Sequence, residues 1–171
     1  MRTVLWSMLV VVSVVGTARA QMTTGPMAEA VIKQIKKLEH DKVQAFLSTA
    51  TSHNYCADWI KEHDSEGIDH TMEDGSRQSK AQVLAELRTG NRKLSKNDQY
   101  DHIYHVYGNG GPGTTVVVSY DSDAVLQYFG RTIRGLGEGT DVWVNVNGKW
   151  WFVLNSVHPR ASQDAAKTLA P

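Results

Sequence analysis

Residues 140–154, TDVWVNVNGKWWFVL, carry the clearest structural signal in the chain. Valine recurs at every second position up to Val146, and the run after Lys149 is again rich in aromatic and β-branched residues, a composition typical of β-strands. Asn147-Gly148 separates the two runs, and this dipeptide favours a two-residue hairpin turn because both residues readily adopt positive φ. The stretch therefore predicts an antiparallel hairpin.

The chain before this hairpin is also strand-like back to about residue 100. Segments rich in Val, Tyr, Trp and Thr predict strands at 100–107, 114–120, 128–146 and 149–158, with a break in the third among Gly135, Gly137 and Gly139. The run from Gly108 to Gly113 matches the Gly-x-Gly-x-x-Gly pattern of dinucleotide sites, but a valine-rich strand follows it. Such a site needs a helix N-terminus at that point, so we expect a hairpin loop.

The first half of the chain predicts helices. Apolar residues from Val31 to Phe46 recur at helical spacing, which favours an amphipathic helix from Pro26 to about Leu47. Two further helices are expected, at 55–62 and between a Ser79 cap and Gly90, with a strand at 67–72 before the second of them. Helices followed by an antiparallel meander predict an α+β protein, with the helices on one face of a curled sheet.

The N-terminus has the pattern of an export signal. Met1-Arg2 leads into a short apolar run that ends at Ala18-Arg19-Ala20, the small-residue spacing that signal peptidases recognise. We therefore expect residues 1–20 to be a cleaved signal peptide and the mature chain to start at Gln21. Residues 21–160 would form a single domain, and 161–171 a flexible tail. The predicted location is secreted or periplasmic, with no membrane anchor.

Charge and cysteine content exclude several classes of protein. Cleavage would remove Arg2 and Arg19 from the 18 basic side chains and leave all 18 acidic ones, for a formal net charge of −2. That balance disfavours a nucleic-acid partner, which needs a basic surface. Cys56 is the single cysteine, which excludes an internal disulfide and any cysteine-rich zinc site.

Several short motifs, in order along the chain, resemble the nuclear-transport-factor-2-like superfamily. They are Leu38-Glu39 in the first helix, Glu73-Asp74-Gly75 after the first strand, Ser79-Lys80 opening the next helix, and the 140–150 hairpin. The chain is most similar to the branch called domain of unknown function 4440, related to the SnoaL-like proteins. The resemblance implies a cone: a strongly curved antiparallel sheet wrapped around the N-terminal helices. Members use its pocket for isomerisation, dehydration or epoxide hydrolysis, or for binding and dimerisation.

One position departs from the ketosteroid isomerases of that superfamily. Their catalytic aspartate lies at the end of the first strand, three residues before a glycine, and Met72 occupies the matching position here. A thioether cannot act as a base. We therefore expect either no catalysis or catalysis by another group.

Histidines are the remaining candidates for acid–base chemistry. By strand alternation His70 shares a face with Ile68 and Met72, and His158 shares one with Phe152 and Leu154, so both are expected against apolar surroundings. A histidine in such a place can exchange protons near neutral pH, or can simply be structural. The catalytic candidates are His70, His158 and His105, and the candidate ligand-binding residues are His70, Met72, Trp143 and His158. Their spacing fits no ordinary metal site, and no cofactor is expected.

Tryptophans predict a second surface. Trp143 faces away from the neighbouring valines, and Trp150 and Trp151 face opposite sides of their strand, so both faces of the hairpin carry large apolar groups. One face should pack on the helices, and a second copy of the sheet would cover the other, giving a homodimer. Shielding by the stems of Arg131 and Arg134 is the alternative.

Two hypotheses for function follow. The first is an exported domain that binds a small, mostly apolar molecule in its conical pocket. The second is a cofactor-free lyase, isomerase or hydrolase that uses a pocket histidine as general acid or base. A catalytic site would bring two titratable groups within hydrogen-bond reach, whereas a binding site need only be concave.

Overall fold

The computed structural model describes residues 22–71 and 76–160 of the 171-residue chain. The predicted signal peptide, Met72, the Glu73-Asp74-Gly75 motif and the predicted tail lie outside these residues. The elements in chain order are α1 (Pro26–Leu47), a 3₁₀ turn (Ser48–Ala50), α2 (Asn54–His63), β1 (Asp64–Thr71), β2 (Arg77–Gln78), α3 (Lys80–Thr89), β3 (Arg92–Tyr107), β4 (Thr115–Tyr128), β5 (Arg131–Val146) and β6 (Lys149–Pro159).

The strands form one six-stranded sheet in the order β2-β1-β6-β5-β4-β3. Strands β3 to β6 form the predicted antiparallel meander. However, β1 pairs parallel to β6, so the sheet is mixed rather than purely antiparallel. The connection between these two strands contains α3 and the rest of the meander, which is ample length for a parallel crossover.

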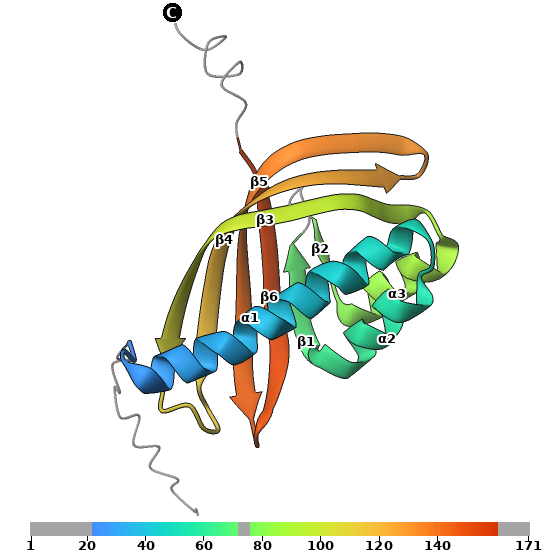
Figure 1. Cartoon of the computed structure of the whole chain (residues 1–171). Helices are drawn as coiled ribbons and strands as arrows, with labels where there is room; N and C mark the ends of the chain where they lie inside the picture. The colour runs from blue at the N-terminus through green and yellow to red at the C-terminus, as the bar shows by residue number, and fades with distance from the viewer. Residues whose placement is uncertain (1–21, 72–75, 161–171) are drawn as a thin grey trace, which may run out of the picture.

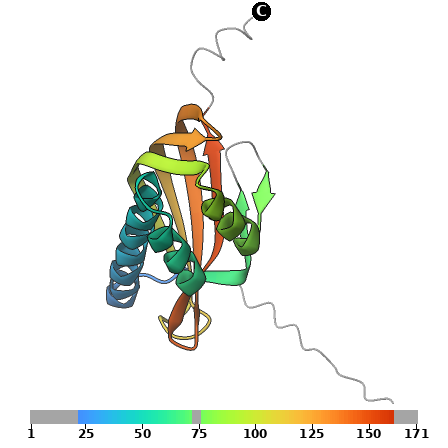
Figure 2. The ribbon, with the colours of Figure 1, turned by 90° about the vertical axis from the view of Figure 1, so that its right-hand side faces the viewer.

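The sheet is strongly curved and open, and the helices cover its concave side (Figures 1 and 2). The α+β class and the wrapped sheet expected from the sequence are therefore confirmed. The core lies between the two layers. Ile35, Ile60 and Leu87 enter it from the helices, and Val116, Trp143 and Phe152 enter it from the sheet. No helix among the described residues is long and apolar enough to cross a membrane.

The residues that predicted the two ends of α3 and the turn between β5 and β6 have the expected conformations. The Ser79 side chain caps α3 in a reciprocal capping box with Gln82, and Gly90 ends the helix in the left-handed conformation at φ 68°. Asn147 and Gly148 both have positive φ, at 53° and 87°, as the predicted hairpin turn requires.

The predicted break in the third strand is wrong. β5 runs without interruption through Gly135, Gly137 and Gly139, and the turn before it lies at Phe129-Gly130. Beyond the body of the sheet, residues 122–137 of β4 and β5 continue as a long curved hairpin, seen at the top of Figure 1. We call these residues the arm.

Gly139 is required by a close contact rather than by a bend alone. It pairs directly with Tyr120 across the β4–β5 ladder. A Cβ on Gly139 would lie 2.2 Å from Tyr120 Cζ, so the tyrosine ring lies over the glycine. Gly139 thereby allows a buried tyrosine to lie flat inside the cone.

Candidate functional site

A cluster of three buried charged side chains lies inside the cone. Glu39 and Lys42 come from α1 and Asp141 comes from β5, and their exposed fractions are 3%, 4% and 0%. The Lys42 ammonium donates to both carboxylates. We call Glu39, Lys42 and Asp141 the buried triad.

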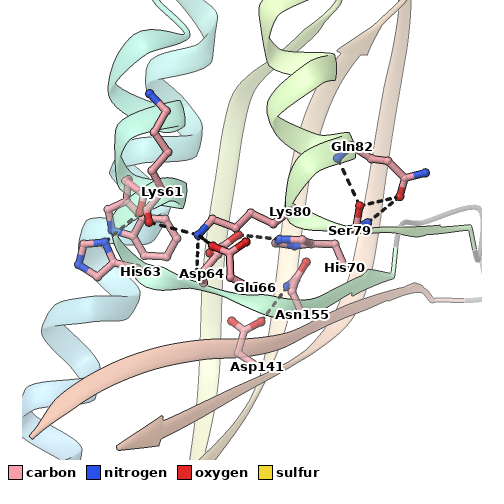
Figure 3. A network of polar contacts seen from close by, with 11 residues as sticks. Lys61, His63, Asp64, Glu66, His70, Ser79, Lys80, Gln82, Asp141 and Asn155 are labelled. Atoms are coloured by element: carbon pink, nitrogen blue, oxygen red, sulfur yellow. Dashed lines mark hydrogen bonds and ion pairs between the residues drawn. The ribbon is translucent and has the colours of Figure 1, made fainter. Parts of the chain in front are cut away.

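Further donors hold each carboxylate of the triad. Trp143 Nε1 donates to Glu39 Oε1 at 2.6 Å, and Asn155 Nδ2 donates to Asp141 Oδ1 at 2.7 Å. Figure 3 shows the Asn155 contact with Asp141. A buried charge is tolerable only when its hydrogen-bonding capacity is filled in this way. The triad is thus a satisfied polar centre within an otherwise apolar core.

Burial and mutual attraction set the protonation of the triad. Burial raises the pKa of Asp141, Lys42 opposes that rise, and the Glu39 carboxylate adds to it. For Lys42, burial alone would lower the pKa, but Asp141 and Glu39 outweigh it and hold the pKa above its usual value. Lys42 therefore stays charged, and burial makes the carboxylate form of Asp141 less stable than it is in water.

A cavity lies beside the triad, on the concave face of the sheet. We call it the inner cavity, and its volume is about 80 Å³. Its hydrogen-bonding lining includes Lys42, Asn97, Gln99, Tyr120, Ser122 and Asn155. Its apolar lining is Phe46, Leu94, Ala124, Phe152 and Val157. The inner cavity is therefore half polar, where the sequence predicted a mostly apolar pocket.

Gln99 in this lining has an unpaired acceptor. Its Oε1 atom is buried and has no hydrogen-bond partner among the described residues. Most buried polar atoms in folded proteins are paired, and an unpaired one costs about 1–3 kcal/mol. A donor group that reached this oxygen would remove that cost.

A second hollow, the side cleft, opens between α1 and β3. Its volume is about 330 Å³, and it shares Asn97 and Gln99 with the inner cavity. Glu39 lines the side cleft and Lys42 lines the inner cavity. The ion pair on α1 therefore forms part of the wall between the two hollows.

His102 is one of two histidines that line the side cleft, and the other is His40 on α1. Its ring centroid lies 6.0 Å from that of Tyr104 and 5.6 Å from that of Tyr120. Burial lowers the pKa of His102, and the nearby Lys42 charge lowers it further. Burial also raises the pKa of Tyr104 to about 12. At neutral pH the cleft therefore offers an uncharged imidazole and an uncharged phenol.

His70 is buried, as expected, but it lies behind the wall of the inner cavity. Its Nε2 atom is 2.9 Å from Asp64 Oδ2 (Figure 3). Its ring packs edge-on against Phe152. Asp64 begins β1 and His70 lies near its end, on either side of an irregular stretch in the pairing with β6. The His70–Asp64 contact therefore joins the two ends of β1 across the irregular stretch.

This placement gives a stability prediction for His70. His70→Ala should lower the free energy of unfolding by about 1–3 kcal/mol, because the buried Asp64 carboxyl loses its partner. His70→Gln keeps an N–H donor and should lose clearly less. Urea unfolding of both variants provides the measurement. Equal stability of the alanine variant and the wild type would refute a structural role for this contact.

His158 does not face the cone. Phe152 pairs with Trp143 but Leu154 pairs with Val142, so Val153 is an extra residue in β6. An extra residue reverses the alternation beyond it. Asn155 consequently reaches Asp141, while His158 is exposed and contacts Ser156 at 2.9 Å. The expectation of apolar surroundings for His158 is therefore wrong.

The other sequence candidates also lie away from the inner cavity. His105 is half-buried and contacts the Met22 sulfur at 3.4 Å, while the adjacent Val106 is buried in the core. His105 is thus on the outer face of β3. Trp143 is fully buried and packs against Phe152 and Trp59. Trp143 contributes to the site through the hydrogen bond that its Nε1 atom donates to Glu39. Met72 lies outside the described residues.

Sequence reasoning missed the triad, although a signal for it exists. The buried stripe of α1 contains Ala28, Val31, Ile35, Glu39, Lys42 and Ala45. Glu39 and Lys42 occupy positions where helical spacing calls for apolar residues. Asp141 likewise alternates with inward-facing Gly139 and Trp143. Charged residues in two core-facing positions of this kind mark a buried polar centre.

Among described residues, no three His, Cys, Asp or Glu side chains converge in a way that could hold a metal ion. The Cys56 thiol is buried in the core, and that burial raises its pKa to about 12. This thiol is therefore protonated at neutral pH. The chemistry of the site rests on the triad, the neighbouring amides and tyrosines, and His102.

Solved structures with the same arrangement belong to the nuclear-transport-factor-2-like (NTF2-like) proteins. An NTF2-like protein from Cytophaga hutchinsonii has a TM-score of 0.65 at 17% identity, covering 75% of this chain and 98% of that chain. An NTF2-like protein of unknown function in nutrient uptake from Rhodospirillum rubrum has a TM-score of 0.60 at 21% identity, covering 74% and 98%. A Streptomyces avermitilis protein designated a candidate dehydratase of the NTF2-like family has a TM-score of 0.60 at 11% identity, covering 78% and 99%.

These likenesses establish the fold, which is the NTF2-like fold that the resemblance implied. No protein-family model matches the sequence, and no curated protein matches it. Assignment to the branch called domain of unknown function 4440 therefore remains a prediction. Function has to be argued from the site itself, since one fold hosts many activities.

Proposed function

We propose that this chain binds a small organic molecule in the inner cavity, with a polar end near Gln99 and an apolar part against Phe46 and Phe152. The unpaired Gln99 oxygen carries the proposal. A ligand hydroxyl or amide could donate to it and remove the penalty of an unpaired acceptor. The sequence suggested a mostly apolar ligand, and the lining favours one with a distinct polar group.

Other side chains of the cavity complement such a group. Lys42 has three N–H donors, and the triad uses two of them. Asn155 and Tyr120 supply further polar atoms beside it. The polar end of the ligand would thus meet both a donor and an acceptor, as a hydroxyl group can.

The probe for this proposal is 1-butanol, followed by saturation-transfer NMR. Gln99→Leu removes the unpaired acceptor and should weaken 1-butanol binding about tenfold, which is the loss of one hydrogen bond. The same variant should be at least as stable as the wild type. Gln127→Leu is the matched control, because Gln127 is exposed on β4. Absence of 1-butanol binding, or equal binding by both variants, would contradict the proposal.

A second candidate function is a cofactor-free lyase, isomerase or hydrolase. His102 favours it, because a lowered pKa leaves the imidazole neutral and able to accept a proton at pH 7. His102 takes the role that the sequence gave to His70, His158 or His105. Histidine-selective NMR titration tests the requirement: His102 must titrate below the ordinary histidine pKa of about 6.5. An ordinary or raised value would remove this candidate.

We further propose a homodimer formed through the outer face of β5 and β6. Trp151 and Leu154 pair with Val144 and Val142 on that face, and all four are only half-buried. Trp143 is buried on the opposite face, so the proposed interface is centred on Trp151. Lys149 Nζ lies 3.9 Å from the Trp151 ring centroid and offers partial shielding in a monomer.

Trp151→Lys tests the assembly. A charge placed in an apolar interface is costly to desolvate, so the variant should shift toward monomer in sedimentation or light scattering. Ser119→Lys, on the neighbouring strand β4, controls for added charge. A wild-type monomer at micromolar concentration would contradict the dimer.

Export remains a proposal that rests on the sequence alone. We propose that the mature chain begins at Gln21 and lies outside the cytoplasm, secreted or periplasmic. N-terminal sequencing of protein isolated from the native host measures this directly. Recovery of the uncleaved chain would contradict it.

A further inference from the structure

The arm carries an apolar groove on its inner face. The groove has a volume of about 110 Å³, and its apolar walls include Leu126, Ile133 and Leu136. It shares Ser122, Ala124 and Val157 with the inner cavity. The two hollows are therefore neighbours on the concave face, with a polar end at the triad and an apolar end in the arm.

Gly135 leaves the floor of this groove open. It pairs with Ala124 on the inner face. A Cβ added to Gly135 would meet no atom within 4 Å. Its backbone is not in the left-handed region, so no turn requires glycine here. Ile133, two residues away on the same face, is 46% exposed, an apolar side chain that a bound chain would cover.

Gly137 lies where the two hollows meet. A Cβ on Gly137 would lie 3.1 Å from Ser122 Oγ and 3.2 Å from Val157 Cγ1. These side chains already fill the space beside Gly137, so a molecule that spans both hollows has to pass over them, and a slim, flexible chain does so more readily than a fused ring system. The charged side chains of residues 124–137 are Arg131 and Arg134, both exposed.

We infer that the inner cavity and the arm groove form one elongated site for a single-chain amphiphile. Its hydrogen-bonding head occupies the inner cavity near Gln99, and its unbranched aliphatic tail lies over Gly135 between Leu126 and Ile133. This inference rests on the proposed function, because the head occupies the same inner cavity. It adds the chemical class of the ligand.

The test uses the series 1-butanol, 1-hexanol and 1-octanol. Each methylene buried in the groove should tighten binding about fourfold, the known effect of removing a methylene from water. Binding is followed by saturation-transfer NMR, and the methyl signals of Leu126 and Ile133 should shift with octanol but not with butanol.

Gly135→Val fills the groove and should abolish the gain with chain length while leaving 1-butanol binding unchanged. Gly67→Val is the matched control, because a Cβ there also meets no atom within 4 Å. If 1-butanol binds but longer alcohols bind no tighter, the groove inference falls and the proposed function stands. If no alcohol binds, both fall. If Gly135→Val leaves the chain-length gain intact, or instead disrupts a dimer, the groove has another occupant and the inference is overturned.

Discussion

Lys42→Met should lower the free energy of unfolding by about 3–5 kcal/mol, the typical cost of removing one partner from a buried ion pair. Lys42 is 4% exposed and is the shared donor to Glu39 and Asp141. Without it, two buried carboxylates face each other. Urea unfolding at neutral pH provides the measurement.

The pH dependence separates this effect from lost packing. In Lys42→Met the folded-state pKa values of both carboxylates should lie above their unfolded values of about 4. The folded variant therefore binds more protons than its unfolded state. The loss of unfolding free energy relative to the wild type should shrink as the pH is lowered toward about 4. Lys37→Met is the control, because Lys37 makes an exposed pair with Asp41, and solvent screening leaves such a pair little effect on stability. A deficit that is independent of pH would refute the electrostatic account.

Gly139→Ala should destabilise the protein by about 3 kcal/mol, at the upper end of the penalty for overfilling a packed interior. The new methyl group would overlap the Tyr120 ring, which is 4% exposed and lines the inner cavity. The ring must move, and movement of Tyr120 changes the cavity beside the triad. The variant should therefore also bind 1-butanol more weakly.

Gly135→Ala provides the matched comparison. It lies four residues earlier on the same face of β5, and its added methyl group would meet no atom within 4 Å. We expect a change in stability within 0.5 kcal/mol, as for most surface substitutions. Similar losses in the two variants would mean that glycine is needed for strand flexibility and not for the tyrosine contact.

Much of the fold could be predicted because its signals are local. The Asn147-Gly148 turn, the Ser79 cap, the Gly90 stop and the amphipathic stripe of α1 each act within a few residues. Where such a local signal is present, it predicts the end of an element or its buried face correctly. The extra length of β3 and β4, and the uninterrupted β5, depend on pairing across the sheet, which local patterns do not report.

The site was harder to predict because its members come together from distant parts of the chain. Lys42 and Asp141 are 99 residues apart, and the contact of Tyr120 with Gly139 depends on strand register. The histidine candidates were ranked by strict alternation, which selected His70 but not His102. His102 follows Asp101, which has a φ of 53° at an irregularity in the β3–β4 pairing. Beyond that point His102 shares the inner face with Tyr104 and Val106, and which face of a strand is turned inward depends on its packing against α1, which local patterns do not report.

The extra residue at Val153 has a consequence for how this fold diverges. If Val153 were instead paired regularly with Val142, Leu154 and His158 would turn toward the cone and Asn155 would turn away from Asp141. The lining would change from amide-rich to apolar with an imidazole, without any change of sequence in the strand. A one-residue shift of register in β6 can thus change the ligand chemistry of the cone. Among homologues, the register of the last strand should therefore track ligand class better than overall sequence identity does.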